Sequence, residues 1–424
     1  MIKFLFLGIL RDKSRSLLPI IIVSVGVFLT VVLIGWMNGI FGDIIDINAN
    51  FTTGHVKVMT RSYADNENQL PNDLALMDVK NLTDTLRNEH PEMTWVQRIR
   101  FGGLIDVPDS KGDTRSQGQA IGTALDLFHP ESGEVERMNI RKALLKGTIP
   151  VKPGEALISD EFATRYHVAV GDSFTYFGTT MNGSMAFKTF IVSGTVRFGT
   201  SIMDRGAMII DLTDARIALD MDDAAGEILG FLPENVYDEK QAEVVETAFN
   251  AKHSNPNDEF SPEMFRLSQL NSMGQYIAIV NNMSFIMVFV FVLGMAVVLW
   301  NTGLLGGLRR YNEYGLRLAL GEEKKHIYRS SLMEAVLIGF LGSFLGTVLG
   351  LIVVYTLQYH PLDISSMTGK VTMLMPQTYR AIVSPSLFYI GYLPGLAAMV
   401  LGSALAGRAI YKRKTAELFK ELEV

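Results

Sequence analysis

The stretch Ser16–Gly42 reads SLLPIIIVSVGVFLTVVLIGWMNGIFG and contains no aspartate, glutamate, lysine or arginine. About 20 mostly apolar residues in a helix, each rising about 1.5 Å, are enough to cross about 30 Å of hydrocarbon. Three further charge-free windows follow in the chain of 424 residues, namely Tyr276–Leu308, Ala335–Leu362 and Ala381–Gly407. The sequence therefore predicts a membrane protein with four transmembrane α-helices.

Lysine and arginine are spread unevenly over the segments between these windows. Four of them precede the first window, six lie between the second and third, and five follow the fourth. The segment between the third and fourth windows contains only Lys370 and Arg380. Because basic residues are retained on the cytoplasmic side of a membrane, we expect both termini to be cytoplasmic. The expected order is an interfacial helix (1–16), the first transmembrane helix (17–41), an outer domain (42–275), the second transmembrane helix (276–303), a cytoplasmic segment (304–333), the third transmembrane helix (334–358), an outer loop (359–384), the fourth transmembrane helix (385–408) and a cytoplasmic tail (409–424).

The outer domain is acidic and has no cysteine. Residues 43–266 contain 35 acidic and 21 basic side chains, a formal net charge of −14, whereas the whole chain has −6. Such a surface would repel nucleic acid, so nucleic acid is not expected as a partner. Without cysteine the domain has no disulfides, and more than 200 residues are enough to form a core without them.

Short apolar runs in this domain predict an α+β fold, for which we expect two lobes. Alternating or β-branched runs bounded by glycine, aspartate or proline are typical of strands. They occur at Phe51–Met59, Trp95–Val107, Gln119–Leu127, Ser173–Phe177, Lys188–Val196 and Ala207–Asp211. Helical spacing of apolar residues predicts helices over Val79–Glu89, Glu239–Lys252 and Ser159–Tyr166, the last beginning at a serine suited to cap it.

No motif for catalysis or metal binding is present in the sequence. The seven histidines are scattered, no cysteine is available as a ligand, and no G-x-x-x-x-G-K-[ST] sequence occurs. We therefore expect no metal site, no bound cofactor and no catalysis by this chain alone.

A charged segment between the second and third windows contains more apolar residues than a simple connector needs. Residues 309–335 read RRYNEYGLRLALGEEKKHIYRSSLMEA. Six lysines and arginines place it in the cytoplasm, and its leucines and tyrosines predict a short amphipathic helix. Such a helix is suited to receive force from a soluble partner.

Small residues recur at four-residue spacing in the membrane windows. Gly342, Gly346 and Gly350 share one helix face, and the pairs Gly35/Gly39 and Gly391/Gly395 have the same spacing. Glycines let helices approach closely in lipid. Packing within one chain and a sliding or dimerising face are both compatible with this pattern.

The run Glu313–Gly321 (EYGLRLALG), followed by Glu334 and Ala335, resembles a coupling-helix pattern, E-x-G-x-x-x-A-x-G…E-A/G. This pattern is that of ABC transporter permeases of the FtsX/MacB/LolC–LolE superfamily. The basic run at Leu10–Leu17, the sequence Pro153–Ser159 and the later Val170-Gly171-Asp172 are also similar to that superfamily. The resemblance spans nearly the whole chain.

The resemblance implies a permease that docks on a separate ATPase and passes its motion to the outer domain. The partners implied are a cytoplasmic ABC ATPase dimer, which itself binds ATP and magnesium, a second permease subunit, identical or paralogous, and an outer carrier or adaptor. It places the chain in the bacterial inner membrane. The residues implied in ATPase coupling are Glu313, Tyr314, Gly315, Arg317, Ala319 and Gly321.

Within the superfamily the chain most resembles the LolC/LolE type, which releases lipoproteins from the membrane. It begins directly with the permease, and Phe51–Val58 is similar to the lipoprotein-release group. MacB-like export of drugs or peptides through an adaptor and duct is the alternative, and an FtsX-like scaffold that activates a cell-wall hydrolase is the second.

A lipoprotein client would need an apolar place for its acyl chains. We expect the outer ends of the first two transmembrane helices to line a lateral pocket, although these side chains could equally face lipid or one another. The residues concerned are Trp36, Met37, Ile40, Phe41, Ile277, Val280, Met283 and Phe285.

Overall fold

The computed structural model describes residues 13–109, 111–197, 206–309, 316–317, 320–363 and 378–412. These residues divide into two compact units. One, the membrane unit, contains the described residues up to Asp43 and those from Ala278 onward; the other, the outer domain, is Ile44–Ile277. Four helices of the described chain are long and apolar enough to span a membrane, so the predicted fold class, four such helices and a large α+β domain after the first, is confirmed.

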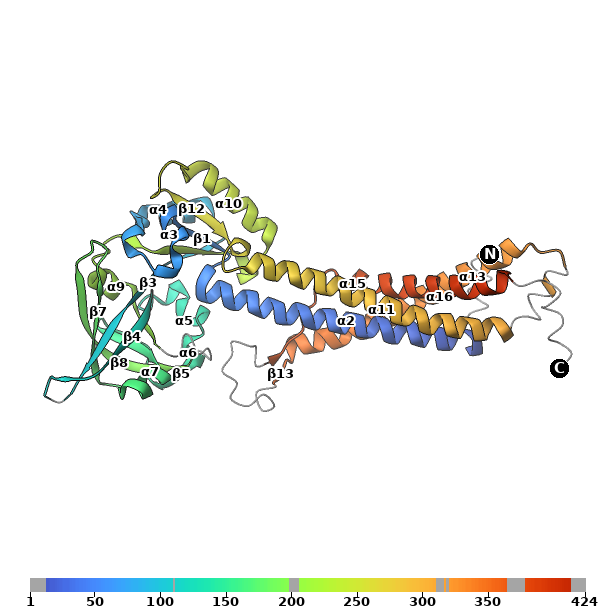
Figure 1. Ribbon diagram of the computed structural model, residues 1–424, viewed down its shortest axis with the longest axis horizontal. Helices are drawn as coiled ribbons and strands as arrows, with labels where there is room; N and C mark the ends of the chain where they lie inside the picture. Colours follow the sequence, from blue (N-terminus) through green and yellow to red (C-terminus); the bar gives the residue numbers. More distant parts are fainter. Residues whose placement is uncertain are drawn as a thin grey trace. The chain divides into compact units, whose positions relative to one another are not determined.

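The first three membrane helices are longer than the predicted spans, and the fourth predicted span is divided between two helices. Helix α2 is Lys13–Asn48, α11 is Met273–Arg309, α13 is Lys324–Tyr359, and α16 is Tyr392–Lys412 after the short α15, Leu387–Ile390 (Figure 1). Both α2 and α11 cross the division between the units, since α2 continues past Asp43 and α11 begins before Ala278. Strands β13 (Leu362–Asp363) and β14 (Thr378–Tyr379) form a small antiparallel pair.

Three glycines of α13 lie in close contact with α2. A Cβ atom added to any of the three would lie 2.8 Å from the Cβ of a valine on α2. The pairs are Gly342 with Val23, Gly346 with Val27, and Gly350 with Val31. Gly391 and Gly395, at the start of the fourth span, approach the side chain of the same Val27. Of the two interpretations of the small residues, the structure therefore supports packing within one chain.

The outer domain is built on one branched sheet whose parts share strand β3, Thr94–Pro108. The first residues of β3 pair with β11 (Glu227–Phe231), which continues the order to β1 (Val56–Thr60) and β12 (Pro262–Arg266). From Ile99 onward β3 pairs with β4 (Thr114–Leu125) instead. The two parts of the domain are thus joined by one continuous strand.

The second part closes on itself as a ring of six strands. Antiparallel pairing joins β4 to β3, β3 to β7 (Ser173–Thr179) and β7 to β8 (Met185–Val196). Strand β8 then runs parallel to β6 (Glu155–Ser159), β6 is antiparallel to β9 (Ala207–Asp211), and β9 returns parallel to β4. Strand β5 (Leu144–Gly147) pairs with the C-terminal end of β8. Because closure removes free edges, this barrel is protected from pairing with other chains.

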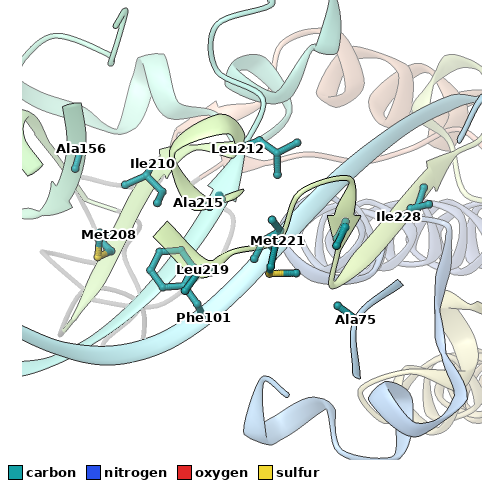
Figure 2. Close-up of a cluster of buried hydrophobic side chains, with 14 of the residues drawn as sticks. Ala75, Phe101, Ala156, Met208, Ile210, Leu212, Ala215, Leu219, Met221 and Ile228 are labelled. Atoms are coloured by element: carbon teal, nitrogen blue, oxygen red, sulfur yellow. The ribbon is translucent and has the colours of Figure 1, made fainter. Parts of the chain in front are cut away.

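Apolar side chains from the whole sheet form the core of this domain. Figure 2 shows Met208 and Ile210 of β9 with Ala156 of β6 and Phe101 of β3, all buried. The covering helices are α4 (Val79–Glu89), α7 (Asp160–Tyr166), α9 (Leu212–Leu219) and α10 (Glu239–His253). The shorter α3 (Arg61–Asp65), α5 (Glu134–Arg137) and α6 (Ile140–Ala143) and the two-residue strands β2 (Leu76–Met77) and β10 (Ala224–Ala225) complete the domain.

Most predicted elements are confirmed, and one is wrong in part. Helix α4 and strand β9 have the predicted bounds, and Ser159 caps α7 by accepting a hydrogen bond from the Phe162 amide at 3.1 Å. The strand predicted from Phe51 begins only at Val56, because the helical path of α2 continues as a π-helical turn, η1, over Ala49–Thr53. The Thr52 hydroxyl donates to the Asn48 carbonyl at 2.9 Å, so this threonine is accommodated in the helix.

Candidate coupling site

The predicted cytoplasmic helix ends at Gly321. The Leu320 amide donates to the Leu316 carbonyl at 3.0 Å, and the Glu322 amide donates to the Arg317 carbonyl, also at 3.0 Å. This second bond, together with Gly321 at φ +91°, is the Schellman arrangement that ends a helix in a left-handed residue. Glycine adopts that conformation without strain, which explains why this position carries one.

Two leucines at this helix end are exposed on one face. Leu316 is 63% exposed and Leu320 is 80% exposed. Residues four apart lie one above the other on a helix, so the pair forms a single apolar surface. Lys325 and Arg329, at the start of α13, are exposed as well. An apolar pair with cations close by in sequence is suited to dock on an acidic protein surface.

The structure describes two of the six predicted coupling residues. Arg317 and Gly321 both belong to this helix end, where the Arg317 carbonyl accepts the closing hydrogen bond. Glu313, Tyr314, Gly315 and Ala319 lie outside the described residues. The role of these six residues stays a prediction, and the two exposed leucines add a surface on which it can be tested.

The turn that follows leads directly into the first turn of α13. The amides of His326 and Ile327 donate to the Glu323 carbonyl, at 2.9 Å and 3.2 Å. The His326 ring nitrogen Nε2 lies 3.7 Å from the Glu322 carboxylate, four residues earlier. Only Glu322 and Glu323 separate Gly321 from α13, so a force on the exposed leucines has a short path into a membrane helix.

The residues predicted to line a lateral pocket differ in exposure. On α2, Met37 is buried, while Trp36, Ile40 and Phe41 are half-buried. On α11, Met283 is 49% exposed and Phe285 is 73% exposed, and Val280 is half-buried. Ile277 belongs to the outer domain, where it packs against an apolar cluster that includes Leu229 and Met273.

A segment before the fourth span covers part of the outer end of α2. The Ile382 amide donates to the Gly35 carbonyl at 3.0 Å, and the Asn38 side-chain amide donates to the Ser384 hydroxyl at 3.0 Å. This contact could not be predicted from the sequence, because isolated asparagine and serine residues at membrane ends are common and carry little signal.

The described residues contain no group of three or more histidine, cysteine, aspartate or glutamate side chains that could hold a metal ion. His55 is fully buried, and its Nδ1 accepts a hydrogen bond from the Leu232 amide at 2.9 Å. Burial, assisted by the nearby Arg137 charge, lowers the pKa of His55 to about 4. The ring is therefore neutral near pH 7, and its contacts with Phe231 and Tyr237, each with ring centres 5.6 Å apart, are those of a core side chain.

Comparison with known families covers nearly the whole chain. Residues 16–246 match the MacB-like periplasmic core domain, and residues 285–415 match the C-terminal region of FtsX-like permeases. No curated protein matches the sequence. Among solved structures, the periplasmic region of MacB from Actinobacillus actinomycetemcomitans is similar at 8% identity and a TM-score of 0.36, over 53% of this chain and 94% of that one.

Proposed function

The chain belongs to the family of ABC transporter permeases with a MacB-like periplasmic core domain and an FtsX-like C-terminal region, and from this premise we propose that it carries motion from a separate cytoplasmic ATPase to its periplasmic domain. Permease subunits of this family are not catalytic alone. The chain thus acts as a lever, and the ATPase dimer supplies both the nucleotide site and the free energy.

The observation that carries this proposal is the exposed leucine pair at the helix end. Leu316 and Leu320 expose apolar side chains that would be more stable if a partner covered them. They precede α13 by only a few residues. Burying two leucines in a groove of the ATPase would contribute about 3–6 kcal/mol before the costs of association. Arg317, from the same turn, supplies a cation beside them.

Two of the membrane helices continue into the periplasmic domain. Helix α2 and its π-helical end reach Thr53, and α11 begins at Met273, so each extends from a membrane span into residues of the periplasmic domain. A hydrogen-bonded helix transmits displacement along its axis better than a loop does, because its backbone has no free dihedral angle to absorb the motion.

As the work performed, we propose release of lipoproteins from the outer leaflet of the inner membrane. Each buried CH₂ of an acyl chain contributes about 0.8 kcal/mol to membrane anchoring, so a multiply acylated protein leaves only with an external source of free energy. The exposed Met283 and Phe285 on α11 are suited to receive such chains in this scheme. Trp36, Ile40 and Phe41 of α2 remain candidates for the other side of the pocket that would hold the acyl chains.

Export of a drug or peptide through an adaptor and duct is the second candidate, and the match of residues 16–246 to the MacB-like core favours it. One reconstitution separates the two. The chain and its ATPase are placed in vesicles with a purified triacylated lipoprotein and a soluble lipoprotein carrier outside. ATP-dependent transfer to the carrier supports lipoprotein release; no transfer, together with ATP hydrolysis stimulated by an added periplasmic adaptor, supports export.

A further inference from the structure

The end of the first membrane helix is held by an arginine from elsewhere in the domain. A helix leaves its last carbonyl groups without partners inside the helix. At the π-helical end of α2, the Arg98 guanidinium of β3 donates to two of them, to the Asn50 carbonyl at 2.8 Å and to the Phe51 carbonyl at 3.1 Å. A cation at this end also interacts favourably with the helix dipole.

Arg98 is fully buried, and its charge is balanced by a buried carboxylate. Its Nε lies 2.7 Å from Glu134 Oε2, and a second nitrogen lies 3.2 Å from Oε1, so the pair is bidentate. Arg137 also donates to Glu134. Burial alone would raise the pKa of Glu134, but the two arginines outweigh it and hold that pKa below its ordinary value. The carboxylate is therefore charged near pH 7, and the guanidinium keeps a fixed orientation.

The same network reaches the neighbouring strand. The Arg137 guanidinium lies 4.2 Å from the centre of the Phe231 ring on β11. Strand β11 pairs with β1, which is the first strand after the helix end. The helix end is thus tied to β3, α5 and β11 at once.

Arg98 occupies the position where β3 changes partners. In the strand register, Arg98 lies opposite Glu227 of β11, and the next residue, Ile99, lies opposite Ala124 of β4 in the barrel. A displacement of the helix end can therefore reach both parts of the sheet through this side chain, alongside the apolar cluster that groups Ala49 with Val96 of β3 and Phe231 of β11. In the sequence Arg98 stands between Gln97 and Ile99, with a second arginine at position 100, so the local pattern does not single it out.

We propose that Arg98 is the force-transmitting contact between the first membrane helix and the periplasmic domain, a positioning residue for the proposed mechanical coupling. The backbone connection alone would transmit motion poorly, because the chain changes direction sharply between η1 and β1. The change occurs at Gly54, which has a φ of +60°. The guanidinium bridges this turn and makes the helix end move with β3. This inference rests on the proposed function.

The test measures whether the domain follows the ATPase. The natural chain has no cysteine, so spin labels attach only at introduced positions. Labels at Tyr359→Cys on α13 and Val244→Cys on α10, which are 62% and 69% exposed, report the distance between the membrane unit and the domain. It is compared in nucleotide-free and ATP-trapped complexes of the full chain with its ATPase.

The unsubstituted chain should show a nucleotide-dependent shift in this distance. Arg98→Lys and Arg98→Gln should lose most of the shift while ATP hydrolysis stays within about twofold. Lysine keeps the charge, but its three donors cannot reproduce the four bonds that the planar guanidinium makes to two carbonyls and both Glu134 oxygens. The control is Lys57→Met/Glu227→Gln, which removes another fully buried ion pair in the same domain, 2.6 Å long, together with the 2.7 Å contact of Lys57 with Glu67. It should keep the shift.

A folded Arg98 variant that keeps the full shift would overturn the inference and leave the proposed function standing. A shift lost equally in the Lys57 control would also overturn it, since general destabilisation would then suffice. No shift in the unsubstituted chain would instead contradict the proposed function. Hydrogen exchange on the unsubstituted chain gives a test that needs no variant: the Gly54 amide, which donates to the Ala49 carbonyl at 2.8 Å, should stay protected during ATP turnover. Faster exchange during turnover would mean that this turn opens, against the proposal.

Discussion

Val27 of α2 and Gly346 of α13 are in such close contact that a Cβ added to the glycine would lie 2.8 Å from the valine Cβ and 2.5 Å from the Ser24 carbonyl oxygen. Neighbouring pairs repeat the contact along both helices. Gly391 and Gly395 approach Val27 from the fourth span, so this valine is enclosed by small residues on two sides. The packing of the membrane unit therefore depends on the absence of side chains at these glycines.

Gly346→Ala should destabilise the membrane unit by about 1–3 kcal/mol, because the methyl group has no room and the helices must separate. The matched control is Gly294→Ala on α11, where an added Cβ would meet nothing within 4 Å. That change should be neutral or stabilising, since alanine favours helix over glycine. Thermal unfolding of the two variants in the same detergent measures the difference, and equal melting temperatures would contradict the packing described.

Leu316→Asp and Leu320→Asp should each weaken association with the ATPase at least tenfold, because each places a charge in an apolar contact and removes buried area. Ile217→Asp on α9, which is 67% exposed in the periplasmic domain, is the control and should not affect association. Affinity is measured by titrating labelled ATPase onto the detergent-solubilised chain. Unchanged binding by both leucine variants would place the ATPase contact elsewhere.

Gly321→Val should also weaken association with the ATPase, but through the backbone of the helix end rather than through the contact surface. No atom lies within 4 Å of the position an added Cβ would take, so the cost is backbone strain at φ +91° rather than a clash. A β-branched residue disfavours this conformation by about 1 kcal/mol or more, and the helix should no longer end at this point. Gly321→Asn tolerates left-handed backbone better and should retain most of the binding. If valine and asparagine bind the ATPase equally well, the helix end is not what positions the leucines.

The stability of the periplasmic domain should fall as the pH drops from 6.5 toward 4.5. His55 is neutral when folded, with a pKa of about 4, whereas in the unfolded chain it binds a proton below about 6.5. The unfolded state therefore takes up more protons in this window, and stability decreases there by up to roughly 3 kcal/mol. Glu134 contributes in the same direction only below its ordinary value of 4.5, where its stabilising pairs begin to be lost.

His55→Asn separates the histidine from other titrating groups. The asparagine oxygen can still accept from the Leu232 amide, but it does not titrate. The melting temperature of this variant should depend less on pH between 4.5 and 6.5 than that of the unsubstituted chain. Parallel pH profiles would show that His55 does not cause the loss.

Photo-crosslinking residues placed at Met283 and Phe285 should capture lipoprotein in native membranes if the acyl chains contact this part of α11. Both side chains are exposed, so the substitutions should not disturb packing. The same residue at Val297, 61% exposed further along α11, is the control and should capture lipid but little lipoprotein. Recovery of no lipoprotein from the first two positions would exclude this part of α11 as the client site.

The membrane part of the fold follows from the sequence because hydrocarbon imposes a length and a polarity that few other structures satisfy. Periodicity likewise identifies α4 and β9 to the residue. The strand predicted at Phe51–Thr53 was wrong. Threonines favour a strand locally, but the preceding helix continues through them, and its backbone accepts hydrogen bonds from their hydroxyl groups. Strand β11 was not predicted, because its glutamate and glycine interrupt the apolar pattern although the strand is buried throughout.

The candidate coupling site could be predicted in part. A charged segment with too many leucines indicated an exposed helix, and Gly321 indicated its end. The contact of Arg98 with the helix carbonyls could not be predicted, because it joins residues 48 positions apart through backbone atoms that no side-chain pattern encodes. Closure of the barrel, with its parallel pairs β4–β9 and β6–β8, is similarly a consequence of long-range pairing.

The central claim is that ATP hydrolysis in the cytoplasm is converted into work outside the membrane through this chain. Its most direct test is the number of lipoprotein molecules transferred to a soluble carrier per ATP hydrolysed, in vesicles containing the chain and its ATPase. We expect a finite, constant ratio for the unsubstituted chain, and transfer lost together with ATPase docking in Leu316→Asp/Leu320→Asp. Transfer that proceeds at the same rate without ATP, or that persists in the double variant, would contradict the claim.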